Sequence, residues 1–159
     1  MSKGFPYGIK EPSGIADAAD RVLDEYFEIT GLLKLGACLA YGLCLGFVRD
    51  GKYIPGDNDL DVVAITPTNS PIPDLSEALI KRGFERGEIF PPPANNVHFH
   101  KDDILLDIFF RKPEGFYTAF DKVMYRGKVY PVPCPVEDYL KACYTNWKVK
   151  MDEAGKYGI

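Results

Sequence analysis

Apolar residues recur at steps of three and four between residues 14 and 34, and this spacing predicts an amphipathic helix. Ser13 can cap the start of that helix, and Asp17 in its first turn interacts favourably with the helix dipole. Gly36 follows the last apolar position and ends the segment. The apolar stripe that would face a core consists of Ile15, Ala19, Val22, Leu23, Tyr26, Phe27 and Leu33.

Short apolar runs bounded by turn residues follow, and they predict the strands of a small sheet. Residues 60–65 are apolar except for Asp61, as expected of a strand that is covered on both faces. A turn at residues 101–103 separates two neighbouring runs, and Arg126–Gly127 divides another into a hairpin. The runs cover residues 37–41, 60–65, 97–100, 104–110 and 123–132.

Shorter helical segments complete the predicted elements. Residues 42–49 predict a tight turn that leads into a short helix. Asp74 can cap a helix through Ile80 that Gly83 ends, and a last helix begins near residues 135–137. Together the elements predict an α+β or mixed α/β fold, in which a small mixed sheet is flanked by helices.

The composition is that of one globular domain. With 159 residues, of which 46% are hydrophobic, the chain is long enough for one core and too short for two. We expect the core of the domain over about residues 14–147, with residues 1–12 and 148–159 peripheral. The 19 Lys and Arg against 23 Asp and Glu give a net charge of −4, without runs of like charge. Nucleic acid is therefore disfavoured as a partner.

The sequence also argues against a membrane or secreted protein. Lys34 and several glycines interrupt the most apolar stretch, residues 31–48, so a membrane-spanning helix is not predicted. Residues 1–10 lack the apolar segment of a secretory signal. The four cysteines form no C-x-x-C pair, and there are only two histidines. We therefore expect reduced thiols, no structural zinc site and a cytoplasmic location.

Three aspartates carry the strongest chemical signal. Asp59 and Asp61 stand two positions apart at the start of a strand, so their carboxylates point from the same face of the sheet. Carboxylates this close repel each other and attract a cation, and hard oxygen ligands favour Mg²⁺ or Mn²⁺. Asp107 is a lone carboxylate within the apolar strand 104–110, where an unpaired charge is costly. The sequence predicts that Asp107 completes a metal site with the other two.

Simpler interpretations of the same residues stay open. Asp107 can form a salt bridge with a lysine or arginine, and the Asp59 and Asp61 segment can be a turn or a calcium loop. The calcium pattern requires glycine at its sixth position, which Val62 occupies. His98 and His100 share one strand face, which either is simply polar or contains a histidine that contacts the donor or acts as a base. Tyr144 and Trp147 are interpreted as packing anchors rather than as stacking platforms for a base.

Gly42 and Gly46 form a G-x-x-x-G pair directly before the acidic segment. Such a pair is typical of a close strand-to-helix packing turn. Before two aspartates, it is also a place where diphosphate or triphosphate oxygens can approach backbone amides. The common phosphate-loop, dinucleotide-binding, zinc-protease and serine-hydrolase motifs are absent from the sequence.

Three segments, in this order along the chain, closely resemble motifs of the LicD/fukutin family of polymerase-β-type nucleotidyltransferases. They are GLCLGFVR at residues 42–49, YIPGDNDLD at residues 53–61 and LDIF at residues 106–109. Residues 132–147 are similar to the closing motif of that family. The resemblance implies metal-dependent transfer of a phospho-alcohol, such as phosphocholine or ribitol phosphate, from a CDP-linked donor to a hydroxyl of a glycan or small molecule.

The resemblance also implies roles for individual residues. Asp59, Asp61 and Asp107 occupy the metal positions and would hold two Mg²⁺ or Mn²⁺ ions, with Asp107 also taking the proton of the acceptor hydroxyl. Arg49 would clamp donor phosphate, and an ion pair with Asp50 or Asp57 is the alternative. Leu43 departs from the family, which commonly has Ser or Thr there. The residues expected to contact the donor diphosphate are Gly42, Leu43, Gly46, Arg49 and Asp57.

Two other functions stay open at this point. The same carboxylates suit a minimal nucleotidyltransferase that moves a nucleoside monophosphate from an NTP to a protein or a small alcohol. Leu43 keeps open a non-catalytic nucleotide-binding or scaffolding subunit. Because the chain is short for the LicD/fukutin family, the acceptor is expected to be small, or a partner protein supplies the missing acceptor surface.

Overall fold

A computed structural model describes residues 13–55 and 59–149 of the chain. The helices are α1 (Ser13–Leu32), α2 (Tyr41–Leu45), α3 (Pro73–Lys81) and α4 (Val136–Cys143), with a π-helical turn η1 (Gly46–Asp50) and a 3-10 turn η2 (Gly115–Tyr117). The strands are β1 (Ala37–Leu39), β2 (Leu60–Ile65), β3 (Glu85–Phe90), β4 (Asn96–Lys101), β5 (Ile104–Arg111), β6 (Phe120–Tyr125) and β7 (Lys128–Pro133).

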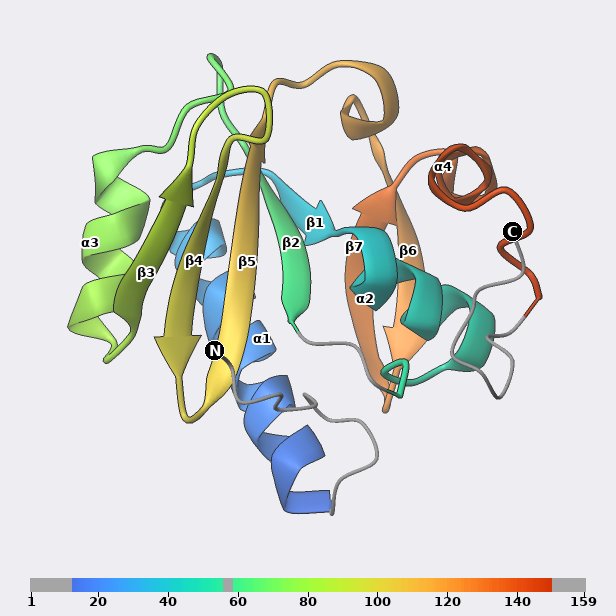
Figure 1. Ribbon diagram of the computed structural model, residues 1–159, viewed down its shortest axis with the longest axis horizontal. Coiled ribbons are helices and arrows are strands. Elements are labelled where there is room, and N and C mark those ends of the chain that lie inside the picture. The colour runs from blue at the N-terminus through green and yellow to red at the C-terminus, as the bar shows by residue number, and fades with distance from the viewer. Residues whose placement is uncertain (1–12, 56–58, 150–159) are drawn as a thin grey trace.

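The strands make a mixed sheet and a separate hairpin. Among the described residues, five strands form the sheet in the order β1-β2-β5-β4-β3, and β6 pairs with β7 (Figure 1). β2 runs parallel to β5, whereas the other neighbours in the sheet are antiparallel. The predicted fold class, a small mixed sheet flanked by helices, is confirmed.

Alternation along β2 and β5 gives the sheet two different faces. Val62 and Ile108 are register partners in these strands, are fully buried and belong to the main hydrophobic core. α1 and α3 pack on this face, with α1 passing behind the strands in Figure 1. Asp61 and Asp107 precede the two core residues, so they point from the opposite face. α1 and α3 thus lie on the face opposite the aspartates, and on the acidic face Tyr41 and Tyr117 pack beside Val63.

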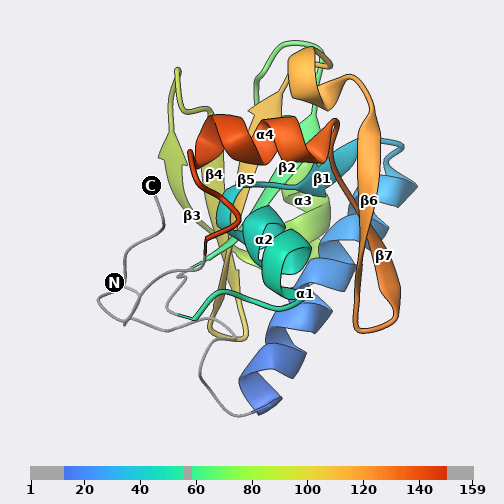
Figure 2. The same cartoon turned by 90° about the vertical axis from the view of Figure 1, so that its right-hand side faces the viewer.

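α2, α4 and the β6–β7 hairpin lie together beyond β1 and β2, as Figures 1 and 2 show. Phe47 of η1 stacks on Tyr125 of β6, with ring centroids 4.1 Å apart. Asp20 of α1 accepts hydrogen bonds from the Tyr53 hydroxyl at 2.5 Å and from the Arg126 guanidinium at 2.7 Å. These contacts fix the hairpin and the segment after η1 against α1.

Several boundaries differ from those that the sequence predicts. The strand predicted over 37–41 ends at Leu39, because Tyr41 already begins α2. Asp74 lies in the first turn of α3 and does not cap it; the cap position is Ile72, and Pro73 stands at the first helical position. Residues 1–12, 56–58 and 150–159 lie outside the described part of the chain.

β3 is absent from the predicted elements. Its side chains are exposed over Glu85 to Ile89, and its pairing with β4 shifts between Arg86 and Ile89. The strand therefore shows no apolar alternation by which a sequence pattern identifies it.

The four cysteines Cys38, Cys44, Cys134 and Cys143 are free. Within residues 13–55 and 59–149, the structure contains no helix with the length and apolar character needed to cross a membrane.

Candidate metal centre

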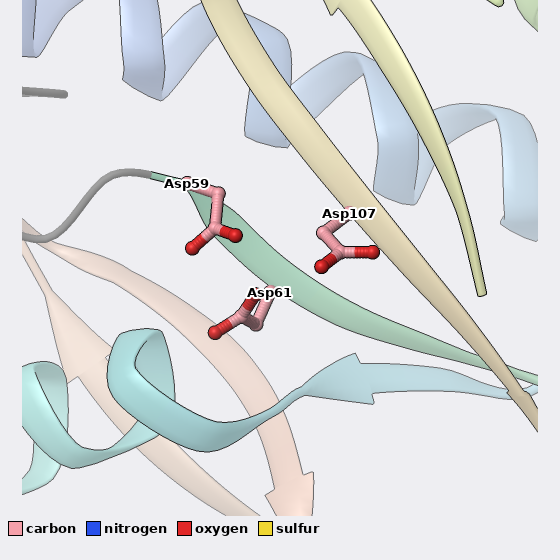
Figure 3. A group of neighbouring side chains, drawn as sticks. All are labelled: Asp59, Asp61 and Asp107. Carbon is pink, nitrogen blue, oxygen red and sulfur yellow. The ribbon is translucent and has the colours of Figure 1, made fainter. Parts of the chain in front are cut away.

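Asp59, Asp61 and Asp107 come together on the face of the sheet opposite α1 and α3. Asp61 of β2 is the register partner of Asp107 of β5, and Asp59 directly precedes β2. One carboxylate oxygen from each residue lies within 4.8 Å of the others, and Figure 3 shows the three side chains facing one another. The predicted convergence of the three carboxylates is confirmed, while their binding of metal stays a prediction.

Electrostatics at this cluster favour a cation. Burial raises the pKa of the Asp59 carboxyl, and the charge of Asp107 raises it further. Hydrogen bonding with Asp61 and the proximity of His98 act in the opposite direction. The net upward shift means that the cluster resists holding all of its negative charge without a positive partner. A divalent cation between the carboxylates would supply such a partner.

Asp107 is 6% exposed, and its two oxygens face different partners. Asn96 donates a hydrogen bond from Nδ2 to Oδ1 at 2.7 Å, and His98 Nε2 lies 3.6 Å from Oδ2. Among the described residues, neither a lysine nor an arginine forms an ion pair with Asp107. The alternative of a salt bridge between Asp107 and a lysine or arginine is therefore wrong. The amide of Asn96 and the ring of His98 are the partners instead.

The two histidines on β4 differ in their surroundings. His98 is the register partner of Asp107, and its ring packs against Phe90 with centroids 4.8 Å apart. The Asp107 carboxylate raises the pKa of His98, and partial burial opposes this shift. His100 is exposed and lies opposite Glu85 at the edge of the sheet. Only His98 of the pair lies beside the aspartate cluster.

The glycine turn is built for close packing. A Cβ atom at Gly46 would lie 2.6 Å from the carbonyl oxygen of Lys52, so the following segment can approach only glycine here. Leu43 is 2% exposed, and its side chain belongs to the main core. Gly42 follows Tyr41, which has a φ of 43° and whose amide donates to the Tyr139 hydroxyl at 2.9 Å. Packing thus explains Gly46 and Leu43, and their contact with a donor stays a prediction.

Arg49 forms the ion pair that the sequence left as an alternative. Its Nε and Nη2 atoms each lie 3.0 Å from an oxygen of Asp50, and both side chains are 6% exposed. Its Nη1 donates to the carbonyl oxygens of Trp147 at 3.3 Å and Val149 at 3.0 Å. These bonds occupy three nitrogen atoms of the side chain, so the geometry favours the structural interpretation of Arg49. Asp57 lies outside the described residues.

Comparisons with known proteins identify the fold. No family model and no curated protein matches the chain. A solution structure of the antibiotic-resistance factor ANT(2″)-Ia is similar, with a TM-score of 0.54 and 14% identity over 74% of this chain and 65% of that one. ANT(2″)-Ia in complex with adenylyl-2″-tobramycin gives a TM-score of 0.52 and 14% identity over 72% of this chain and 67% of that one. The chain has a polymerase-β-like nucleotidyltransferase fold.

The comparisons support this fold and leave the narrower LicD/fukutin resemblance without a matching family model. The chain spans about two thirds of the length of ANT(2″)-Ia. Within the shared fold, β2 and β5 are the strands that carry the aspartate cluster.

Sequence reasoning missed two contacts, that of Asn96 with Asp107 and that of the Tyr41 amide with the Tyr139 hydroxyl. Asn96 is the first residue of β4 and comes next to Asp107 only through the register of β4 on β5. Tyr139 reaches the Tyr41 amide from 98 positions away. Neither relationship has a local pattern. A lone buried carboxylate requires a donor, however, and that requirement is a signal to search the neighbouring strand for an amide.

Proposed function

We propose that the chain is a metal-dependent nucleotidyltransferase that transfers a nucleoside monophosphate from an NTP to an acceptor hydroxyl. The convergence of Asp59, Asp61 and Asp107 within 4.8 Å on one face of the sheet carries this proposal. Three carboxylates form the hard oxygen donor set that Mg²⁺ and Mn²⁺ prefer, so the residues present fit such ions.

Each aspartate has a role in the proposed reaction. Asp59 and Asp61 would hold both ions, and Asp107 would hold one and accept the proton of the acceptor hydroxyl. Bound Mg²⁺ would stabilise charge on the attacking and leaving oxygens of an in-line displacement. The acceptor oxygen forms a bond to the α-phosphorus, the bond from this phosphorus to the β-phosphate oxygen breaks, and pyrophosphate leaves.

Nucleotidyl transfer is preferred over phospho-alcohol transfer for two reasons. The fold is that of nucleotidyltransferases, and one structure with this fold contains the adenylylated small molecule adenylyl-2″-tobramycin. The LicD/fukutin resemblance, by contrast, rests on short segments of this sequence. Phospho-alcohol transfer from a CDP-linked donor is the second candidate, supported by residues 42–49 and 53–61.

The acceptor is proposed to be a small molecule, or to be presented by a partner protein. A small-molecule acceptor is supported by the similar structure of ANT(2″)-Ia, which contains adenylyl-2″-tobramycin. A cytoplasmic location is part of the same proposal.

The test is a donor screen followed by an assay of transfer. Thermal unfolding is measured with each NTP and with CDP-choline and CDP-ribitol, in Mg²⁺ and in EDTA, because a bound ligand raises the melting temperature. NTPs labelled at the α-phosphate are then incubated with hydroxyl-bearing acceptors. We expect Mg²⁺-dependent binding of an NTP and transfer of label.

Variants make the assay specific. Asp107→Asn should abolish transfer, whereas Asp74→Asn, which removes an exposed carboxylate in the first turn of α3, should leave it unchanged. Stabilisation by CDP-alcohols alone would favour the second candidate. Binding of nucleotides that is identical with and without metal, and identical in Asp107→Asn, would favour the non-catalytic binding subunit.

A further inference from the structure

We infer that Asn96 is a positioning residue for the metal centre, which orients the Asp107 carboxylate without neutralising it. The inference rests on the proposed function, because it assumes that Asp107 is a metal ligand. Asn96 itself does not reach the metal in this proposal. It acts through the hydrogen bond from its Nδ2 to Asp107 Oδ1, at 2.7 Å.

The placement of Asn96 is determined by the sheet. Asn96 is the register partner of Phe109, two positions from Asp107 along β5, so both polar side chains stand on the same face as diagonal neighbours. β4 and β2 flank β5 on opposite sides. Asn96 therefore holds the Asp107 carboxylate from the side opposite Asp59 and Asp61. In Figure 3, one oxygen of Asp107 points toward these two aspartates and the other points away.

The backbone that presents Asn96 is itself fixed. Asn95 has a φ of 52°, in the left-handed region that asparagine adopts more readily than most residues. Its amide donates to the carbonyl of Pro91 at 3.3 Å, and its carbonyl accepts from the amide of Phe110 at 2.9 Å. The chain thus enters β4 at a defined point, and the Asn96 side chain begins from an anchored position.

The chemical nature of Asn96 explains why it suits this place. It is 6% exposed, and a buried amide costs free energy unless it is hydrogen-bonded. A lysine or arginine would satisfy Asp107 equally well, but its charge would cancel the negative charge that attracts a divalent cation. A neutral donor fixes one oxygen of the carboxylate and leaves the charge available. Groups that orient metal ligands in this way typically contribute about 10–100-fold to metal affinity.

The experiment measures Mn²⁺ binding directly, without nucleotide or acceptor. The dissociation constant is determined from the EPR signal of free Mn²⁺ for wild type, Asn96→Leu and Asp107→Asn. Val97→Ala is the matched control, because Val97 is the next residue of β4, is 2% exposed and packs into the main core. Thermal unfolding in EDTA gives the loss of stability of each variant separately.

We expect Asn96→Leu to raise the dissociation constant of Mn²⁺ by about tenfold or more. Val97→Ala should keep it within about twofold although its melting temperature falls. If Asn96→Leu does not fold, Asn96→Ser serves instead, since a serine hydroxyl is too short to make the same bond. Equal Mn²⁺ affinity in wild type and the Asn96 variant would overturn the positioning role alone. If wild type does not bind Mn²⁺, or binds it no more tightly than Asp107→Asn does, the metal centre is wrong, and the positioning role is wrong with it.

Discussion

Asp61 and Asp107 stand directly opposite each other in the parallel pair of β2 and β5. Parallel neighbours in a sheet are close, so two acids in one register position repel each other. The chain keeps both in a face where an apolar pair would be more stable. Residues that lower the stability of the fold in this way are typical of a functional site.

The first prediction separates activity from folding. Asp61→Asn should lower transfer by about a hundredfold or more and should leave the melting temperature in EDTA unchanged or higher, because one of the repelling charges is removed. Transfer and thermal unfolding are measured on the same preparations, with Asp74→Asn as the control. Loss of folding together with activity would assign Asp61 a structural role.

The second prediction concerns pH and metal. Because the pKa of Asp59 is raised above its ordinary value of 3.8, the folded chain holds this proton more tightly than the unfolded chain does. The free energy of unfolding of the metal-free protein therefore loses a contribution as the pH rises through the interval between the two values. Asp59→Asn removes this pH-dependent part of the free energy of unfolding. In wild type, Mg²⁺ should restore the lost stability at the higher pH values.

Urea unfolding between pH 4 and pH 8, with EDTA or Mg²⁺, tests this prediction for wild type and Asp59→Asn. In EDTA, the free energy of unfolding of Asp59→Asn should increase relative to that of wild type as the pH rises. Parallel pH profiles would contradict the raised pKa of Asp59.

The third prediction concerns His98. The Asp107 carboxylate raises the pKa of His98, so the protonated histidine stabilises the metal-free folded state. This contribution is complete below the ordinary pKa of 6.5 and is lost as the pH rises through the raised value. The chain has two histidines, so an NMR titration with His98→Gln assigns the signal. Asp107→Asn and bound Mg²⁺ should each lower the pKa of His98. A pKa of His98 that neither change alters would contradict the contact between His98 and Asp107.

The fourth prediction distinguishes the two interpretations of Arg49. Arg49→Ala removes the paired bonds to Asp50 and the two bonds to backbone carbonyls, so the free energy of unfolding should fall by about 2–3 kcal/mol, the scale of charged hydrogen bonds. Nucleotide affinity of the folded variant should stay near that of wild type. Calorimetry with an NTP and Mg²⁺ measures that affinity. A loss of affinity of about tenfold or more would instead indicate that Arg49 binds the donor phosphate.

The strands that carry the site could be predicted because their sequences are simple. Residues 60–65 and 104–110 are apolar runs in which one charged residue stands out, and a charge in a buried strand requires a chemical reason. This argument identifies Asp61 and Asp107, and Asp59 is identified by its place two positions before Asp61. The local sequence does not encode which strands are neighbours, so the Asn96 contact and the exposed strand β3 follow only from the three-dimensional register.

Arg49 illustrates a different limit. A guanidinium binds phosphate and carboxylate with the same geometry, so its residue type cannot distinguish a ligand from a neighbouring side chain. Its partners Trp147 and Val149 lie about a hundred positions further along the chain. Position in a motif therefore predicts an anionic partner for Arg49 and does not decide between donor phosphate and Asp50.

The bond from the Tyr41 amide to the Tyr139 hydroxyl has a consequence for biosynthesis. All three aspartates and the turn at Tyr41 emerge from the ribosome before α4 does, yet the turn lacks this acceptor until Tyr139 has been made. Contacts between such distant positions form late, because a long loop must close first. The nascent chain therefore carries all three aspartates before the bond that completes the turn at Tyr41 can form, and this bond forms only when the last described helix has docked.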